Sequence, residues 1–406
     1  MAGSELEEAE KLLLGLFDFE RARLAQKKLK PFTTERVREA LRSRSINPES
    51  PRPIIHLAGT KGKGSVAWLL HWALSERYER VGLFSSPHLI SLRERIRIGD
   101  QLVGVKEMKA RAEVLHRLNQ DSFDGELTFF EFLFLMAMEE FAEAQCPWVI
   151  LETGMGGRLD ATNAVASRLS VLTRIDYDHM EFLGNTLESI AGEKAGIVKD
   201  GGEVVALKQS QEVNEVFEAV CRKKGAKLHW VVPEAQGAAG ENLALAKEVL
   251  NCIGEDSAVL DRVTLNLPGR FQEVEVCGAK LILDSAHNPL SLSVLSSHLQ
   301  SKSSEWEGAF AMAEGREVED MLRPLLRSTN KLNVFELPGG RPGLSPEQIL
   351  RVWISMGGEG ELKDDLGAWL KSSAQNPRYL TGSFYLVGEA LKELGFQAEE
   401  LWPQPI

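Results

Sequence analysis

Short apolar runs alternate with longer amphipathic stretches along most of the chain, a pattern typical of α/β proteins. Leucines at helical spacing predict a helix over residues 5–19, and Thr33 or Thr34 is placed to cap a second helix that ends at Ser43. The runs that we predict to be strands in the first part of the chain are 54–58, 81–84, 148–151, 169–172 and 204–207. A helical pattern over residues 65–74 follows the first of them, so we expect a mostly parallel sheet with helices on both faces.

The alternation restarts after the segment 265–269, which contains Pro268 and Gly269. Beyond it we predict strands at 279–283, 332–336 and 379–384, a helix at 290–299 and a last helix that ends near Leu394. The boundary is therefore expected near Asn266. Residues 1–266 form the larger domain in this prediction, and residues 267–406 form a smaller α/β domain of Rossmann-like character.

Composition and charge narrow the class of protein. The 406 residues are 43% hydrophobic and 26% charged, which is ordinary for a soluble globular chain. Lys and Arg number 47 against 59 Asp and Glu, and the net charge of −12 disfavours nucleic acid and membrane surfaces as partners. A local basic pocket for a small anion remains compatible with that charge.

Cysteine spacing and the amino terminus bear on the compartment. Four widely spaced cysteines without a Cys-x-x-Cys pair argue against a disulfide scaffold or a zinc motif and favour a reducing compartment. The amino terminus is acidic where a signal peptide is basic, and no apolar run approaches the ~18 residues of a membrane span. We therefore expect a cytoplasmic protein.

A glycine-rich segment between the first predicted strand and its helix is the sharpest chemical signal; it comprises Gly59, Thr60, Lys61, Gly62, Lys63, Gly64 and Ser65. Glycines let backbone N–H groups close around phosphate oxygens, a lysine neutralises charge, and a hydroxyl can bind magnesium. At ~4 Å and an effective dielectric constant of ~20, one lysine–phosphate charge pair contributes about 4 kcal/mol before desolvation. The spacing departs from G-x-x-x-x-G-K-[ST], because Gly64 separates Lys63 from Ser65. The alternative is a flexible turn that caps a helix; the strand before and the helix after favour phosphate binding.

Two further strand ends carry polar side chains. Glu152 follows a predicted strand and precedes a glycine-rich turn, which is where open α/β sheets place ligands and metals, although most strand-end glutamates are only solvated. His179 follows the strand at 169–172 and lies among acidic residues, and imidazole can bind a metal or carry a proton. Lys194 belongs to a predicted helix that stops before Asp200; a lysine there is usually a solvated charge, but its spacing does not separate a buried lysine from an exposed one.

The second predicted domain contributes its own candidates. Arg270 lies at the domain junction, where its guanidinium could reach a phosphate held by the first domain, or simply form an inter-domain ion pair. Asp284 and His287 follow the strand at 279–283, so they are expected to face a cleft rather than a core.

In this order the segments resemble the folylpolyglutamate synthase and dihydrofolate synthase family of the Mur ligase superfamily, whose members are ATP-dependent amide-forming ligases. The resemblance runs from about Leu12 to Gly388. It is carried by the segments 59–65, 85–89 with 93–97, 152–158, 179 with 183–184, 193–197 and 284–289.

The resemblance implies a fold and a set of site residues. The fold is a P-loop-containing, Mur ligase-type first domain with a mostly parallel sheet, followed by the Rossmann-like carboxyl-terminal domain. The loop would hold the phosphates of ATP, and the other nucleotide contacts would be Asn242, Arg270, Asp284 and His287. Magnesium, as two ions, would be held by Ser65, Glu152, His179 and Lys194, the last as a carbamate. The catalytic group would comprise Lys63, His179 and Lys194. The folate pocket would contain Ser85, Ser86, Pro87 and His88, with Phe129 and Phe130 as weaker candidates.

The activity implied is transfer of the ATP γ-phosphate to a carboxylate, followed by attack of the L-glutamate amine on the acyl phosphate to leave an amide, ADP and phosphate. The acceptor stays open between a folate such as tetrahydrofolate and dihydropteroate, and a monomer is expected. One segment, 309–316, departs from the family pattern and puts part of the glutamate site in doubt. Two alternatives remain: another Mur-type ligase that acts on a cell-wall precursor or an amino-acid polymer, and a nucleotide-binding module without catalytic activity.

Overall fold

A computed structural model describes residues 6, 8, 10, 12, 13, 16, 33–49, 53–235, 237–263, 266–303, 305–329, 331–339, 342–374 and 376–401. The helix predicted over 5–19 lies largely outside the described residues. The helix predicted up to Ser43 is present as α3 (Glu35–Ser43), with Thr34 at its N-cap position. No helix in the described ranges is both long enough and apolar enough to cross a membrane.

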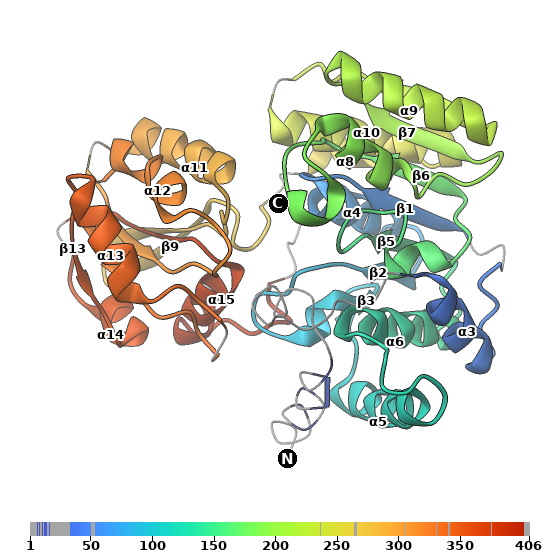
Figure 1. Ribbon diagram of the computed structural model, residues 1–406, viewed down its shortest axis with the longest axis horizontal. Helices are drawn as coiled ribbons and strands as arrows, with labels where there is room; N and C mark the ends of the chain where they lie inside the picture. Colours follow the sequence, from blue (N-terminus) through green and yellow to red (C-terminus); the bar gives the residue numbers. More distant parts are fainter. Residues whose placement is uncertain are drawn as a thin grey trace.

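The first sheet has eight strands in the order β4-β3-β2-β5-β1-β6-β7-β8. These strands are β1 (Ile54–Ala58), β2 (Val81–Phe84), β3 (Ile96–Ile98), β4 (Gln101–Leu102), β5 (Trp148–Glu152), β6 (Leu169–Leu172), β7 (Glu203–Leu207) and β8 (Lys227–Val231). From β2 to β8 every neighbouring pair is parallel, and only the β2–β3 and β3–β4 pairs are antiparallel. The sheet crosses the larger lobe (Figure 1).

Helices cover both faces of this sheet. They are α4 (Lys63–Ser75), α5 (Val105–Ser122), α6 (Phe129–Glu143), α7 (Met180–Leu183), α8 (Leu187–Ala195), α9 (Gln211–Lys224) and α10 (Ala238–Ile253), with short 3-10 turns η1 (Leu92–Arg95), η2 (Ala161–Ala164) and η3 (Ser257–Arg262). Alternate residues of β1 enter opposite cores: Ile54 packs with α3, α5 and α6, whereas Ile55 packs with α4 and α10. This two-sided burial explains why the central strands are continuous apolar runs.

The second sheet has six strands in the order β13-β12-β11-β14-β10-β9. They are β9 (Gln272–Val276), β10 (Ala279–Leu283), β11 (Glu307–Phe310), β12 (Lys331–Val334), β13 (Glu359–Leu362) and β14 (Arg378–Thr381). Around them lie α11 (Pro289–Lys302), α12 (Val318–Leu322), η4 (Leu325–Arg327), α13 (Pro346–Ser355), α14 (Leu366–Lys371) and α15 (Phe384–Glu393). Only β9 runs antiparallel to its neighbour.

Both sheets confirm the predicted α/β class with mostly parallel strands, and every predicted strand is present. The last one is shorter than predicted: β14 ends at Thr381, and Ser383 then accepts a hydrogen bond from the Tyr385 N–H and caps α15. The pattern did not predict β3, β4, β8, β9, β11 or β13. Several of these are edge strands whose side chains are partly exposed, so they lack a continuous apolar run.

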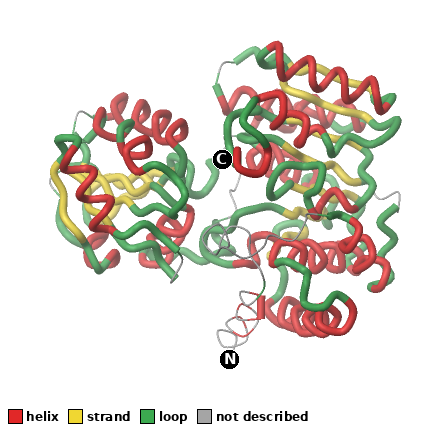
Figure 2. The backbone as a smooth tube through the Cα atoms, viewed as in Figure 1, coloured by secondary structure: helices red, strands yellow, loops and turns green. Residues whose placement is uncertain are grey.

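The two sheets lie in separate lobes, each with its own helical layers (Figure 2). The predicted boundary after residue 266 falls between η3 and β9, and we retain it as a proposal. The lobes touch where α15 meets the loop after β2: an added Cβ at Gly388 would lie only 1.9 Å from the Leu89 carbonyl oxygen. This close approach fixes how the second lobe faces the carboxyl ends of the strands in the first.

Candidate active site

A cavity of about 840 Å³ lies where the two lobes face each other. The carboxyl ends of β1, β2, β5, β6 and β10 lie at its wall, and parallel sheets bind ligands at these ends. The sequence-predicted residues that line it are Thr60, Lys61, Gly62, Lys63, Gly64, Ser65, Ser85, Ser86, Pro87, Glu152, His179, Asn242, Arg270, Asp284 and His287.

The glycine-rich loop joins β1 to α4, and α4 begins at Lys63, two residues earlier than predicted. Gly62 has a φ of 89°, and a Cβ there would lie 2.2 Å from the Asn242 Oδ1 atom. Several hydrogen bonds hold the loop on the segment after β6. Among them, the Thr60 N–H donates to the Arg174 carbonyl at 2.8 Å, the Thr60 hydroxyl to the Asp176 carbonyl at 3.0 Å, and the Thr173 hydroxyl to the Lys61 carbonyl at 2.7 Å. The free N–H groups at the start of α4 are therefore held in place at the cavity, an arrangement that favours anions.

Two lysines donate to one carbonyl of this loop. Lys63 Nζ lies 2.9 Å from the Gly59 oxygen, and Lys194 Nζ lies 3.0 Å from the same atom. Lys194 is only 3% exposed, so it is a buried lysine and not the solvated charge that is usual on a helix. Burial, and then the charge of Lys63, lower the pKa of Lys194 to about 7. The cost of holding the two amines side by side, one of them buried, falls when an anion enters the cavity.

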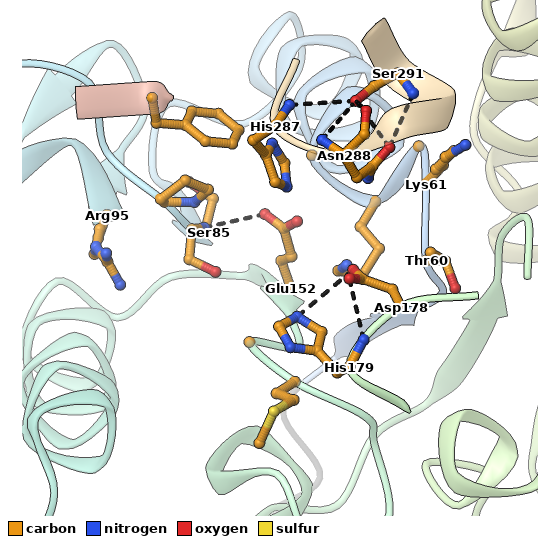
Figure 3. A pocket seen from close by; sticks show the side chains of 18 of the residues that line it. Thr60, Lys61, Ser85, Arg95, Glu152, Asp178, His179, His287, Asn288 and Ser291 are labelled. Atoms are coloured by element: carbon orange, nitrogen blue, oxygen red, sulfur yellow. Dashed lines mark hydrogen bonds and ion pairs between the residues drawn. The ribbon is translucent and has the colours of Figure 1, made fainter. Parts of the chain in front are cut away.

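Glu152, the last residue of β5, is 4% exposed and points into the cavity (Figure 3). One of its carboxylate oxygens accepts a hydrogen bond from the Ser86 N–H at 3.1 Å. Burial raises the pKa of Glu152, and the charges of Lys63 and Arg270 oppose that rise. A Cβ at Gly64 would lie 3.6 Å from this carboxylate, so Glu152 faces the start of α4 next to Ser65.

His179 follows β6 and adopts a left-handed backbone, with φ at 49°. Asp178 holds it from two sides: one carboxylate oxygen accepts the His179 backbone N–H at 3.1 Å, and the other lies 3.5 Å from its Nε2 atom. Arg316 of the second lobe lies 3.7 Å from Asp178. Burial acts to raise the pKa of Asp178, but the cationic or titratable neighbours His179, His287 and Arg316 outweigh it and leave the pKa lowered.

The second lobe presents Arg270, Asp284 and His287 to the same cavity. Asp284 accepts hydrogen bonds at 2.9 Å from the N–H groups of Phe271 and Ala286, and burial raises its pKa against the charge of Arg270. Burial and the charge of Arg316 lower the pKa of His287 to about 4, so its ring is neutral at pH 7. The Arg270 guanidinium lies 5.0 Å from the centre of the Phe384 ring.

The segment after β2 forms another wall. Glu94 accepts three backbone N–H groups, from Leu89, Ile90 and Ser91, and so fixes the turn that carries Ser85, Ser86 and Pro87. His88 lies behind this wall, where its Nδ1 atom accepts a hydrogen bond from Arg95 Nε at 3.0 Å. Phe129 and Phe130, at the start of α6, line the cavity beside it.

Three of the predicted site residues do not line the cavity: Gly59, His88 and Lys194. Gly59 is the first residue of the loop, and Lys194 donates a hydrogen bond to its carbonyl oxygen. Sequence reasoning also missed several residues that shape the site, namely Asp178, Glu94, Asp160 and Arg316. Asp160 accepts the Gly154 and Met155 N–H groups at 3.0 Å and so shapes the turn after Glu152. Asp178 could have been found only from its position next to His179. Glu94, Asp160 and Arg316 act through tertiary contacts that the neighbouring residues in the sequence do not indicate.

The donor set fits a divalent metal. A buried carboxylate faces a hydroxyl at a helix N-terminus beside a phosphate-type loop, and hard cations such as Mg²⁺ prefer oxygen ligands of this kind. Ser65 and Glu152 are the residues placed to share such an ion, and His179 is a nitrogen donor in the wall of the same cavity.

Comparisons with known proteins agree with this geometry. The Mur ligase middle domain matches residues 57–279, more than half of the chain, and the dihydrofolate synthetase C-terminal domain matches residues 269–340. The dihydrofolate synthetase of Saccharomyces cerevisiae is 29% identical, with 85% of this chain and 94% of the yeast protein covered.

A second relative, the dihydrofolate synthase/folylpolyglutamate synthase of Escherichia coli, is 31% identical over 84% of this chain and 87% of its own length. A crystal structure of a bifunctional folylpolyglutamate synthase/dihydrofolate synthase with Mn, AMPPNP and L-glutamate bound superposes with a TM-score of 0.75 at 29% identity, covering 91% of this chain and 95% of that one. By the extent of these matches, the chain belongs to the dihydrofolate synthase/folylpolyglutamate synthase family of Mur ligases.

Proposed function

We propose that this protein is an ATP-dependent ligase that joins L-glutamate to the carboxylate of a pteroate or folate compound and releases ADP and phosphate. One observation carries the proposal: a single cavity brings together a phosphate-type loop, a buried carboxylate suited to a divalent metal, and polar residues of a second lobe. The alternative of a catalytically inactive nucleotide-binding module has no use for a buried carboxylate and a histidine facing that loop.

The chemistry follows from the charges in the cavity. A carboxylate is a poor acyl donor, so one of its oxygens attacks the γ-phosphorus of ATP and ADP leaves, which gives an acyl phosphate. The amine of glutamate then attacks the acyl carbon, loses a proton, and phosphate departs to leave the amide. Lys63 and Arg270 offset the repulsion among these anions, and a bound divalent metal adds positive charge at the transferred phosphoryl group.

In this proposal the loop residues Gly59 to Ser65 hold the phosphates of ATP, while Asn242 contacts the base and Arg270, Asp284 and His287 complete the nucleotide site. Asn242 supports this role because it packs against Gly62 of the loop and is buried at the cavity wall. Arg270, Asp284 and His287 face the loop from the second lobe, so they can act only while the two lobes are together.

Two metal positions are proposed. Ser65 and Glu152 hold one magnesium ion, and His179 and a carbamylated Lys194 hold the other. The state of Lys194 supports carbamylation: only a neutral amine reacts with carbon dioxide, with loss of one proton, and the pKa of Lys194 is lowered to about 7. The product would be an anionic oxygen ligand in place of a buried cation.

Dihydropteroate is the acceptor that we favour, because the matching carboxyl-terminal model is that of dihydrofolate synthetase. A reduced folate is the second candidate, since the E. coli relative carries both names. The pterin ring is proposed to lie against Ser85, Ser86 and Pro87, with His88 behind them, next to Phe129 and Phe130. We also propose that one chain suffices for activity, because the residues of both lobes come from the same chain; size-exclusion chromatography with light scattering tests this.

The test offers the enzyme ATP, Mg²⁺ and L-glutamate with either dihydropteroate or tetrahydrofolate, and weighs the products by mass spectrometry. One added glutamate on dihydropteroate is expected, with one ADP per amide. Lys63→Ala should abolish both products, whereas the matched variant Lys208→Ala, on an exposed residue away from the cavity, should leave them unchanged. Absence of ADP release with both acceptors, or full activity of Lys63→Ala, would contradict the proposed function.

A further inference from the structure

Away from the catalytic cavity, a glutamate, a histidine and a cysteine converge between β7, β8 and α10. Glu203 begins β7, His229 lies in the middle of β8, and Cys252 lies in the last turn of α10. One ligand atom from each residue lies within 4.8 Å of the other two. Because Glu203 pairs with Lys227 in the parallel ladder, His229 is two residues further along β8 and lies on the same face as Glu203.

A fourth residue, Glu248, completes the group. It precedes Cys252 by four residues on α10, so both side chains lie on one face of the helix. Its Oε1 atom is 3.6 Å from His229 Nδ1 and 3.8 Å from Cys252 Sγ. On the other side of the ring, His229 Nε2 is 3.5 Å from the Glu203 carboxylate, yet this buried nitrogen has no hydrogen-bond partner among the described residues.

This group is electrostatically unfavourable without a cation. A buried ring nitrogen without a partner costs free energy, and two carboxylates lie close to a thiol. A divalent ion would satisfy the nitrogen, neutralise the carboxylates and displace the thiol proton in one step.

We propose that Glu203, His229 and Cys252 form a Zn²⁺ site, with water as the fourth ligand. The ion would bind a Glu203 oxygen, His229 Nε2 and the Cys252 thiolate, and the thiol proton would pass to solvent. Zinc–ligand bonds of about 2.0–2.3 Å require the three donors to approach one another by about 1 Å, within reach of side-chain rotation. Glu248 would position the ring by accepting its Nδ1 proton, as carboxylates commonly do for metal-bound histidines.

The ligand types separate this site from the catalytic one. Imidazole and thiolate favour zinc, whereas the oxygen-rich catalytic cavity favours magnesium. The proposed zinc site also lies at the amino ends of the strands, because Glu203 is the first residue of β7, whereas the catalytic cavity lies at their carboxyl ends. The same helix α10 carries Asn242 near its other end, so a bound ion would fix α10 and the edge strand β8 relative to the sheet.

Cobalt substitution tests the site directly. The full chain is stripped of metal with a chelator, saturated with Mg²⁺ to fill oxygen-donor sites, and titrated with Co²⁺ while near-ultraviolet absorption is recorded. A thiolate-to-cobalt charge-transfer band that saturates at one ion per chain is expected, and Zn²⁺ should displace it. Cys252→Ser should abolish the band, and Cys277→Ser, which alters an exposed cysteine in the other lobe, should leave it intact.

Two further variants keep the thiol in place. Glu203→Gln and Glu248→Gln should each weaken Co²⁺ binding by about 10–100-fold while circular dichroism shows an unchanged fold. Absence of the band in the wild-type chain, or a band that survives in Cys252→Ser, would overturn the proposal.

Discussion

Single residues at the active site carry charges that the fold alone does not stabilise. Glu152 and Lys194 are almost fully buried, and the pKa of each is shifted toward its neutral form mainly by burial. Their polar contacts are few: Glu152 accepts the Ser86 N–H, and Lys194 donates to the Gly59 carbonyl. Such groups cost stability, and their presence is explained by what enters the cavity beside them.

Glu152→Gln tests this trade between stability and activity. The amide keeps the shape and removes the charge, so ATP-dependent ligation should fall by at least about 100-fold because a metal ligand is lost. Since burial raises the pKa of Glu152, removing its charge should leave the thermal unfolding temperature at pH 7 unchanged or higher. Glu188→Gln, on the exposed side of α8, is the control for both assays. A large loss of stability with activity retained would contradict this view of Glu152.

At the scale of elements, α4 joins the site to the core. Its first turn forms the phosphate-type loop, while residues 66–74 are buried between the sheet and α10. The helix is therefore apolar on all sides, and its amino end is oriented by the packing of its body.

Gly62→Ala should separate loop geometry from helix formation. The new Cβ would lie 2.2 Å from Asn242 Oδ1 at a φ of 89°, so either the loop or Asn242 must move. We expect ATP affinity, measured by calorimetry, to fall by at least about tenfold, with helix content unchanged. Gly192→Ala, where a Cβ meets nothing within 4 Å, should bind ATP normally. Equal affinity of the two variants would show that the close approach is unimportant.

His71, in the middle of α4, makes this helix sensitive to acid. Its Nε2 atom lies 3.0 Å from the Val81 carbonyl, and burial, followed by the charge of Arg97, lowers its pKa to about 3. Between about pH 3 and pH 6.5 the unfolded chain therefore binds a proton that the folded chain excludes, so stability falls as pH decreases through this window. The contribution is up to about 1.4 kcal/mol per pH unit.

His71→Gln removes this titration and can keep an N–H donor toward Val81. The acid-unfolding midpoint, followed by circular dichroism, should move to lower pH than in the wild type. An unchanged midpoint would mean that other groups dominate acid unfolding.

At the scale of the whole molecule, function depends on how the two lobes meet. Gly388 of α15 approaches the Leu89 backbone so closely that an added Cβ would lie 1.9 Å from the Leu89 oxygen. A further link is the ion pair between Arg93 and Glu399, at 2.5 Å. The chain as a whole carries a net charge of −12, whereas Lys61, Lys63, Arg270 and Arg316 place positive charge in the wall of the cavity.

Gly388→Ala should change the position of the second lobe relative to the first without unfolding either lobe. We expect a larger radius of gyration by small-angle X-ray scattering and a kcat/KM lower by at least about tenfold, because Arg270 and His287 would move away from the loop. Glu389→Ala changes the next, half-exposed residue of the same helix and should affect neither quantity. If Gly388→Ala has the scattering profile and turnover of the wild type, the contact between Gly388 and Leu89 does not set the position of the second lobe.

The local pattern of the sequence was sufficient for much of the architecture. Continuous apolar runs identified the central strands because these are buried on both faces, and the glycine-rich segment between a strand and a helix identified the loop. The apolar pattern did not predict edge strands such as β8 and β13, because one side of each strand is exposed and the apolar run is broken. The sequence left the burial of Lys194 open for a related reason: its helix carries no strong pattern, and the residue contacts Gly59, 135 residues away.

The sequence by itself therefore determined the α/β class, the positions of most strands along the chain and the phosphate-type loop, since each depends on neighbours within a few residues. Only the tertiary structure decided that Lys194 lies beneath that loop, that Arg316 faces Asp178 from the other lobe, and that Glu203, His229 and Cys252 converge. Burial and electrostatic coupling depend on distances in space, and residues that are remote along the chain meet only when the sheets, the helices and the two lobes have packed together.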